Sequence, residues 1–246
     1  MGQEFDATVI NLDRDTERLA HFSAQMAAAD VRFERLPGVL GNNPPPHLRP
    51  QFAASQLTPG EIGCYASHLL AMEKVTKPTL ICEDAIVLTN PQAFIPALNA
   101  ALHVLPNDWD LLHLMKPKKA SVPLAPLSHG VNLVLHSKVP RGSCAYLISP
   151  EGARKLTRPT PRIWTNDDDI KTFWRFNLNI YGINPGLVAR SKLKSTIDMV
   201  HDRGAKFRHF RTLSLDRFTQ GVPMNIRRMG FRPWLVCQFK NLVGAR

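Results

Sequence analysis

Two adjacent carboxylates, Glu83 and Asp84, interrupt an otherwise apolar run over residues 79–88. A short apolar run of this kind predicts a buried strand. Burying two acids in a strand is costly unless something cationic pairs with them, so chemistry is expected here first. The alternative is a strand that ends at Asp84 with both acids turned to solvent, because acids are mostly exposed residues.

Three further acids, Asp167 to Asp169, open a predicted helix shortly after Trp164. Acids in the first turn of a helix interact favourably with its dipole, so capping alone would explain them. Yet three acids behind a tryptophan exceed what a cap requires, and tryptophan is a usual platform for the faces of sugars. We therefore expect Asp168, and after it Asp167, to act as a general base fixed by the helix start. Trp164 and Asp169 are expected to contact the sugar acceptor.

A strand over residues 7–12, a turn, and a helix through Ala29 form a predicted β-turn-α unit. This order places Asn11 and Arg14 at the carboxyl end of a strand, the edge where open α/β sheets bind ligands. Arg14 and Arg18 are about one helical turn apart and could face a phosphate together. The alternative is that both arginines are solvated.

The next predicted helix begins at Thr58, where T-P-G-E has the form of a capping box with proline at the first helical position. Ser67 and His68 lie in the middle of this helix. A lone histidine there is more often structural than a ligand, and we retain His68 as a candidate for holding the acidic strand or a donor. The remaining predictions are strands over residues 31–36, 109–114, 131–135, 145–148 and 180–189, helices over 91–105 and from 149, and loops over 38–50 and 116–126.

Composition limits the class of protein. The 246 residues are 44% hydrophobic, enough for one large domain or one domain with an appendage. There is no run of about 18 apolar residues and no basic and apolar leader, so we expect a cytoplasmic protein. The four cysteines include no C-x-x-C pair and therefore indicate neither a zinc site nor a disulfide framework. They are expected to be reduced.

Most of the formal net charge of +11 lies in the last segment, because residues 203–246 carry ten Lys and Arg against one acid, 10 − 1 = +9. Large apolar residues interleave with the basic ones, a composition that suits an anionic membrane surface. We expect peripheral association with the inner face of the cytoplasmic membrane. The alternative is that the apolar residues complete the core. Gly230 and Pro233 forbid one continuous helix in either case.

The basic tail also raises the alternative of a nucleic-acid-binding protein. No nucleic-acid motif is recognisable, and that interpretation would leave the acidic strand and the Trp-Asp cluster unexplained. We therefore expect no nucleic-acid partner.

Several motifs, taken in order, resemble glycosyltransferase family 25, the lipopolysaccharide and lipooligosaccharide core glycosyltransferases that share ancestry with collagen galactosyltransferases. The most specific is L-T-P-G-E-I-G-C over residues 57–64, followed by Ser67 and His68. The others are V-I-N-L-D-R (9–14) with Arg18, I-C-E-D (81–84), A-Y-L-I-S (145–149) with Gly152 and Ala153, Asp167, and the Pro185 strand with S-T-I (195–197). The run of acids behind Trp164 also resembles the acceptor-side element of β-1,4-galactosyltransferases.

The resemblance implies an α/β fold of the GT-A type, a Rossmann-like single domain over residues 1–202 with a basic, partly apolar C-terminal segment over 203–246. It implies inverting transfer of a hexose, galactose first, from a UDP-sugar to a glycolipid or oligosaccharide acceptor of the lipopolysaccharide type. A divalent metal, Mn²⁺ before Mg²⁺, would neutralise the leaving nucleotide. Asp84 and His201 are the expected metal ligands. The expected donor-binding residues are Asn11, Leu12, Arg14, Arg18, Glu61, Ser67, His68 and Glu83.

One departure from the family pattern concerns the metal. The family usually reads E-D-D where this chain has Glu83, Asp84 and Ala85, so one metal oxygen is missing. Adjacent strand residues point to opposite faces, so Glu83 and Ala85 are expected to share a face that Asp84 does not. Metal affinity would be reduced, or the metal would use another ligand such as His201. A catalytically weakened or inactive family member is the alternative.

Overall fold

The N-terminal β-turn-α unit forms as predicted. The computed structural model describes residues 2–191 and 215–244, and in it β1 (Asp6–Asn11) leads into α1 (Thr16–Ala28). Alternate residues of β1 are buried, and α1 buries Phe22 and Met26 one helical turn apart. Asn11 therefore lies at the carboxyl edge of the first strand.

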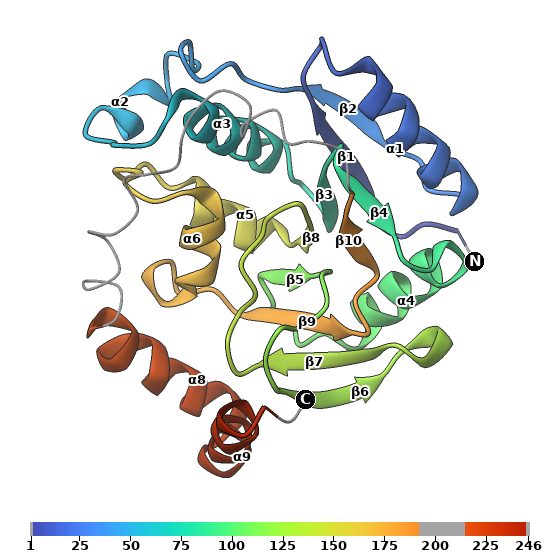
Figure 1. The fold of residues 1–246 in the computed structure, drawn as a ribbon, viewed down its shortest axis with the longest axis vertical. Coiled ribbons are helices and arrows are strands. Elements are labelled where there is room, and N and C mark those ends of the chain that lie inside the picture. Colours follow the sequence, from blue (N-terminus) through green and yellow to red (C-terminus); the bar gives the residue numbers. More distant parts are fainter. Residues whose placement is uncertain (1, 192–214, 245–246) are drawn as a thin grey trace.

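One mixed sheet of eight strands organises the described part of the chain (Figure 1). In sheet order the strands are β2 (Glu34–Pro37), β1, β3 (Thr79–Glu83), β8 (Ala145–Ile148), β5 (Leu111–His113), β9 (Ile180–Asn184), β7 (Asn132–His136) and β6 (Ser121–Pro126). β1 is parallel to β2 and β3, and β5 is parallel to β9, while the other pairs are antiparallel. Only β7 and β8 run against the rest. The predicted α/β class is confirmed.

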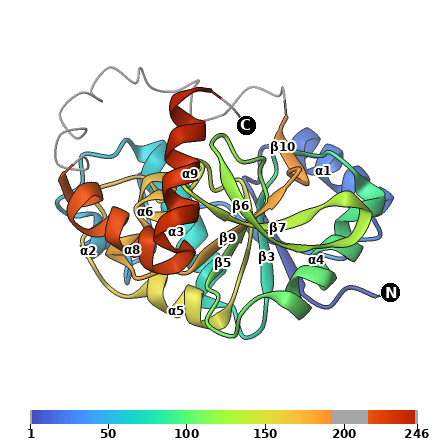
Figure 2. The same cartoon turned by 90° about the horizontal axis from the view of Figure 1, so that it is seen from below.

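Helices cover both faces of this sheet, and successive residues of β3 pack into different layers (Figure 2). On one face, α1 and α4 (Pro91–Val104) share an apolar cluster with Leu80 and Cys82. On the other, α3 (Pro59–Glu73), α5 (Pro150–Thr157) and α6 (Asn166–Lys171) share a cluster with Ile81. The short α2 (Arg49–Phe52) packs on α3. A strand buried on both faces requires this period of two.

The predicted strand over residues 79–88 is two strands, so the prediction of one continuous strand was wrong. β3 ends at Glu83, and β4 (Ile86–Leu88) pairs antiparallel with β10 (Val188–Arg190) in a separate two-stranded sheet. The backbone N–H of Ser191 donates to the carbonyl of Ala85 at 2.9 Å, which extends this second pairing to the bend. The chain thus leaves the large sheet at its two acids. The predicted strand over 180–189 divides in the same way into β9 and β10.

The predicted loop over residues 116–126 contains β6, so that prediction was wrong in part. β6 is the last strand of the large sheet and pairs with β7 alone. An edge strand tolerates Pro123 and Pro126 because one of its sides needs no ladder partner. The prolines that indicated a loop are compatible with a strand only at this position.

Two helices lie near the C-terminus, α8 (Val222–Met229) and α9 (Phe231–Leu242). Gly230 separates them with a φ of 82°, which confirms the predicted interruption. Polar side chains attach both helices to the sheet: Asn225 donates to the carbonyl of Ser137, and Asn241 donates to its hydroxyl. None of the helices in residues 2–191 and 215–244 is long and apolar enough to cross a membrane. The predicted domain boundary at residue 202 lies outside the described residues and stays a prediction.

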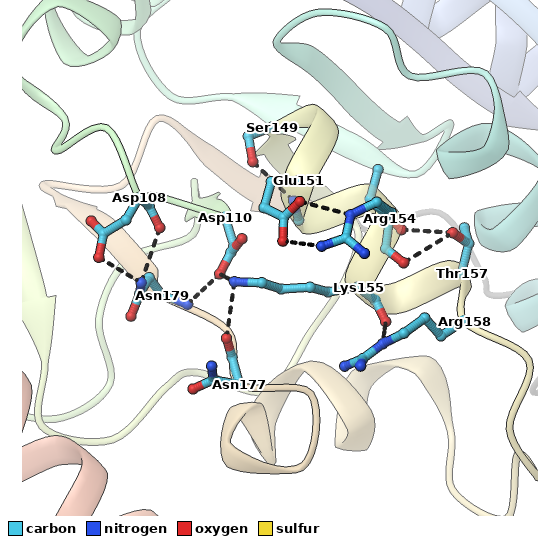
Figure 3. A network of polar contacts seen from close by, with 12 residues as sticks. Asp108, Asp110, Ser149, Glu151, Arg154, Lys155, Thr157, Arg158, Asn177 and Asn179 are labelled. Atoms are coloured by element: carbon cyan, nitrogen blue, oxygen red, sulfur yellow. Dashed lines mark hydrogen bonds and ion pairs between the residues drawn. The ribbon is translucent and has the colours of Figure 1, made fainter.

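A buried ion pair fixes the start of β5 and β9 (Figure 3). Asp110, directly before β5, is fully buried. Its Oδ2 accepts hydrogen bonds of 2.7 Å from Lys155 Nζ of α5 and from the backbone N–H of Asn179, directly before β9. This network ties α5 to the edge of the sheet that lies opposite to Glu83. A cavity forms at the other edge, at the strand ends around Glu83.

Candidate functional site

A cavity of about 320 Å³ opens at the carboxyl ends of β1 and β3, beside the N-terminus of α3. Its volume lies at the lower end of the range for small-molecule sites. Loop residues 38–42, Pro59 and Gly60 form one side of it, and Cys64, Ala85, Cys144 and Arg190 contribute to the rest. Seven residues predicted to bind a donor or a metal line the cavity, namely Leu12, Arg14, Arg18, Ser67, His68, Glu83 and Asp84.

Two glycines allow the loop after β2 to lie against α3. A Cβ at Gly41 would be 1.5 Å from the carbonyl oxygen of Pro59, and a Cβ at Gly63 would be 2.4 Å from that of Val39. Ser67 completes the contact, because its Oγ accepts from the backbone N–H of Val39 at 2.8 Å and donates to the carbonyl of Gly63 at 2.7 Å. Ser67 therefore shapes the cavity wall by holding its backbone.

Glu61 caps the helix that borders the cavity. Both hydrogen bonds of the predicted capping box form, with Thr58 Oγ1 accepting from the backbone N–H of Glu61 and the Glu61 carboxylate accepting from that of Thr58. Glu61 is not among the residues that line the cavity. In this geometry it is a capping residue, and the donor contact predicted for it stays a prediction.

Asp84 is buried at the bend after β3, and both of its carboxylate oxygens have partners. Oδ2 accepts a hydrogen bond from Asn11 Nδ2 at 2.7 Å, and Oδ1 pairs with Arg18. Burial raises the pKa of Asp84, and the Asn11 hydrogen bond and the Arg18 charge oppose that rise. Asn11 Oδ1 in turn accepts from Arg35 Nε at 2.9 Å. Asn11 thus supports the cavity from behind Asp84.

The metal ligands predicted at the acidic motif do not assemble into an oxygen-rich site among residues 2–191 and 215–244. Asp84 uses both oxygens for Asn11 and Arg18, and Ala85 offers no side-chain oxygen. His201 lies outside the described residues. Mg²⁺ and Mn²⁺ prefer several oxygen ligands. The described residues therefore do not fit the Mn²⁺ or Mg²⁺ site predicted at Asp84.

Beside Glu83 lies a fully buried histidine. His68 Nδ1 shares a hydrogen bond of 2.9 Å with the hydroxyl of Tyr146, and its Nε2 lies 3.5 Å from Glu83 Oε1. Cys64 precedes His68 by four residues on α3, so the two share a helix face. Desolvation, with added repulsion from Glu83 and Asp167, raises the pKa of the Cys64 thiol well above its usual value. His68 thus contacts the acidic strand, as predicted for it.

Asp167 is the acid of α6 that pairs with a residue of the cavity wall. Its Oδ1 accepts a hydrogen bond from Ser143 Oγ at 2.6 Å, and its Oδ2 lies 3.6 Å from Nη2 of Arg190. Arg190 lines the cavity. The side chain of Asp167 remains 23% exposed, so it keeps access to solvent beside Arg190.

Asp168 and Asp169 hold α6 in place instead. Asp168 Oδ2 accepts from the hydroxyl of Thr165 at 2.9 Å and from Arg141 at 3.0 Å. Asp169 is 1% exposed, accepts from the hydroxyl of Tyr65 at 2.6 Å and pairs with Arg175. Asp169 thus belongs to the interior ion-pair network, and Asp168 belongs to the cap of α6.

The acceptor contacts predicted for Trp164 and Asp169 stay predictions, and both residues are largely buried. Trp164 is only 9% exposed and presents little of its ring face to a ligand. Nearby Arg162, which is fully buried, donates to the hydroxyl of Tyr65 and lies over the Phe176 ring. The Trp-Asp cluster therefore belongs largely to the interior.

Arg190 and Cys64 are among the cavity residues that were absent from the predicted site. Arg190 is the last residue of β10, and nothing in its sequence surroundings indicates its ion pair with Asp167. Cys64 carries a recognisable signal, because it precedes His68 by one helical turn on a predicted helix. The spacing of Cys64 and His68 does not reveal that Glu83, at the end of β3, faces the same point.

Comparison with known proteins gives the family. The sequence profile described as glycosyltransferase family 25 (LPS biosynthesis protein) matches residues 5–171. The chain is 31% identical over 145 residues to procollagen galactosyltransferase 1-B from Xenopus laevis. That match covers 56% of this chain and 22% of the length of the frog protein.

Two solved structures have weak overall likeness. One is a mutant Drosophila β-1,4-galactosyltransferase 7 in complex with manganese, UDP-Gal and xylobiose, with 11% identity and a TM-score of 0.45 over 84% of this chain and 77% of that one. The other is a putative glucose-1-phosphate thymidylyltransferase from Bacillus anthracis in complex with sucrose, with 10% identity and a TM-score of 0.34 over 74% of this chain and 69% of that one. These scores are too low to carry an argument about the site.

The profile match spans most of the described N-terminal region, including β1, α3, β3 and the whole of α6. The chain therefore belongs to glycosyltransferase family 25. This confirms the family resemblance that the sequence motifs predicted.

We expect Arg18 and Asp84 to be energetically coupled. Arg18→Met leaves a buried carboxylate without its cation and should lower the free energy of unfolding by about 3 kcal/mol. The Arg18→Met/Asp84→Asn double variant should recover part of that loss, which gives a coupling energy on the order of 1–3 kcal/mol. Urea unfolding of the four proteins measures it.

The matched control for this cycle is Arg14→Met, which removes a neighbouring exposed arginine. Its free energy of unfolding should change by less than about 0.5 kcal/mol. Strictly additive losses for Arg18→Met and Asp84→Asn would show that the pair does not hold the bend.

Proposed function

We propose that this chain transfers galactose, with inversion at the anomeric carbon, from UDP-galactose to a lipopolysaccharide-type glycan. The observation that carries the proposal is a cavity with three arginines on its wall, one of them paired with the carboxylate of Asp167, in a chain of glycosyltransferase family 25. The frog relative is a galactosyltransferase, which supports galactose, and the family takes part in lipopolysaccharide biosynthesis, which supports the acceptor.

The cavity wall offers complementary surfaces for the two parts of a nucleotide-sugar. Arg14, Arg18 and Arg190 supply positive charge for a diphosphate. The first turn of α3 lies beside them and adds the positive end of a helix dipole. Apolar side chains of Leu12 and loop residues 39–40 suit the faces of a nucleobase. The donor would lie with its phosphates between α1 and α3.

Transfer requires a base for the acceptor hydroxyl. As the acceptor oxygen forms its bond to the anomeric carbon, the bond from that carbon to the phosphate oxygen breaks, and UDP leaves with the electron pair. The hydroxyl proton would pass to a carboxylate. The contacts of Asp167 with Ser143 and with the cavity residue Arg190 support this role for Asp167. Asp168, the first choice on sequence grounds, bonds to Arg141 and Thr165 instead.

The test is a transfer assay that follows UDP release and glycan mass, with UDP-galactose and a truncated lipooligosaccharide. Asp167→Asn should lower kcat by about 10²–10⁴-fold, because the proton loses its acceptor. Asp168→Asn should lose at least about tenfold less than Asp167→Asn. UDP-galactose affinity, measured by calorimetry, should be retained in Asp167→Asn.

The outcomes of this assay separate the alternatives. If the wild-type chain binds UDP-galactose tightly but forms no product, the result would support the alternative of a catalytically inactive family member, which Ala85 suggests. A larger loss in Asp168→Asn than in Asp167→Asn would overturn the assignment of the base. Loss of donor affinity in Asp167→Asn would move that residue to the donor site.

We also propose that α9 holds the enzyme on an anionic membrane, where a glycolipid acceptor would be embedded. Polar contacts attach this helix to the sheet, while its apolar side chains face solvent. The exposed apolar residues recur at helical spacing and include Phe231, Leu235, Val236, Phe239 and Leu242. Basic Arg232 and Lys240 lie among them and are also exposed. An exposed apolar stripe flanked by cations favours a lipid surface over a core-completing role.

Vesicle co-sedimentation tests this surface. The chain should bind phosphatidylglycerol vesicles in a salt-sensitive way, because each basic residue near the surface contributes about 1 kcal/mol. Phe239→Ser/Leu242→Ser should weaken that binding by about tenfold or more, through lost apolar burial. The matched control, Val104→Ser/Leu124→Ser, removes two exposed apolar residues elsewhere and should bind as the wild type does. Equal binding to phosphatidylcholine vesicles, or dimers in place of vesicle binding, would refute the membrane surface.

A further inference from the structure

We propose that Cys64, His68 and Glu83 form a binding site for a divalent transition metal of the Zn²⁺ class. One potential ligand atom from each residue, a thiol sulfur, an imidazole nitrogen and a carboxylate oxygen, lies within 4.8 Å of the other two. All three residues line the cavity. A cation between them would have three protein ligands and a fourth position facing the cavity, the arrangement of catalytic zinc sites.

The histidine is prepared for this role. His68 is completely buried, and Tyr146 engages its Nδ1, so Nε2 is the nitrogen directed at Glu83. Nε2 has no hydrogen-bond partner within the part of the chain that the structure describes. A buried polar atom without a partner is costly, and a metal would satisfy it. The bond from Nδ1 to a fixed hydroxyl is the support that metal-binding histidines usually have.

The local fold brings the three donors together. Cys64 and His68 lie four residues apart on one face of α3, a spacing that lets two helical side chains share one ion. Glu83 arrives from the last position of β3, immediately before the bend that Asp84 and Arg18 hold. The site contains no C-x-x-C pair, because its third ligand is Glu83 of β3 and not a second cysteine.

The donor set determines which metal fits. Sulfur and imidazole nitrogen favour Zn²⁺ and Co²⁺, whereas Mg²⁺ and Mn²⁺ prefer oxygen ligands. The site would therefore select against the two ions expected from the acidic motif. On binding, the Cys64 thiol loses its proton to solvent and ligates as thiolate, which balances one of the two positive charges. Glu83 balances the other.

The position of the site gives it a role that rests on the proposed function. Arg18 and Arg190 line the same cavity, so the open coordination position faces the region assigned to the diphosphate. The oxygen that the family has at the position of Ala85 would be compensated by the sulfur of Cys64 and the nitrogen of His68 on α3. Metal binding by the free protein does not depend on the identity of donor or acceptor.

The experiment is a titration of the full chain, stripped with EDTA and dialysed, with Co²⁺ as a spectroscopic probe. A thiolate-to-cobalt charge-transfer band and intense visible bands of four-coordinate Co²⁺ should appear at one equivalent. Zn²⁺ should abolish both, and a large excess of Mg²⁺ should not. Cys64→Ser and Glu83→Gln should each weaken Co²⁺ binding by more than about 100-fold, and Tyr146→Phe by about tenfold.

Two variants serve as controls. Cys237→Ser removes another buried thiol, in α9, and should leave the titration unchanged. Glu73→Gln changes another carboxylate, at the far end of α3, and should also retain the thiolate band, because Glu73 is not a ligand. Circular dichroism checks that each variant folds. If Cys64→Ser does not fold, Glu83→Gln still tests the site, because the Glu83 side chain is partly exposed and its replacement should be tolerated. No band at one equivalent, a band that persists in Cys64→Ser, or displacement of Co²⁺ by Mg²⁺ would overturn the site. A positive titration with no sugar transfer would refute only the proposed function.

Discussion

The buried carboxylate of Asp84 is the constraint around which the cavity is arranged. An ionised acid at this depth needs partners, and it obtains them from two separate elements, Asn11 at the end of β1 and Arg18 on α1. These contacts fix where the chain turns out of the large sheet. They also place Glu83, Asp84 and Ala85 together on the cavity wall. In a continuous strand, Asp84 would point to the face opposite to Glu83 and Ala85. The motif is therefore both a structural bend and a part of the site.

The sequence predicted elements with strong periodicity or local chemistry well. α1 and α3 follow from their apolar spacing, and the capping box at Thr58 forms with both of its hydrogen bonds. The break at Gly230 follows from the same local logic. Each of these features depends on residues within a few positions of one another. Local rules suffice for them because no distant partner decides the outcome.

Features set by distant partners could not be predicted from the sequence. The bend at Asp84 depends on pairing between β4 and β10, whose residues are about a hundred positions apart. Asp167, Asp168 and Asp169 look equivalent in sequence, and only their partners Ser143, Arg141 and Tyr65 distinguish them. Arg14 and His68, which the sequence predicted as donor-binding residues, both line the cavity. They could be found from the sequence because local patterns predict strand ends and helix faces. The separation of roles among the three acids required the fold.

The central claim is that the cavity between α1, α3 and the end of β3 binds a nucleotide-sugar. Hydrogen–deuterium exchange, read by mass spectrometry with and without UDP-galactose, tests it without requiring turnover or a known acceptor. Binding should slow exchange in peptides that contain residues 38–42, the first turn of α3 and residues 83–85, because these residues border the cavity. Peptides around Asp110 and Lys155 at the opposite edge of the sheet should exchange at unchanged rates. Protection confined to that opposite edge, or no protection at saturating UDP-galactose, would contradict the account.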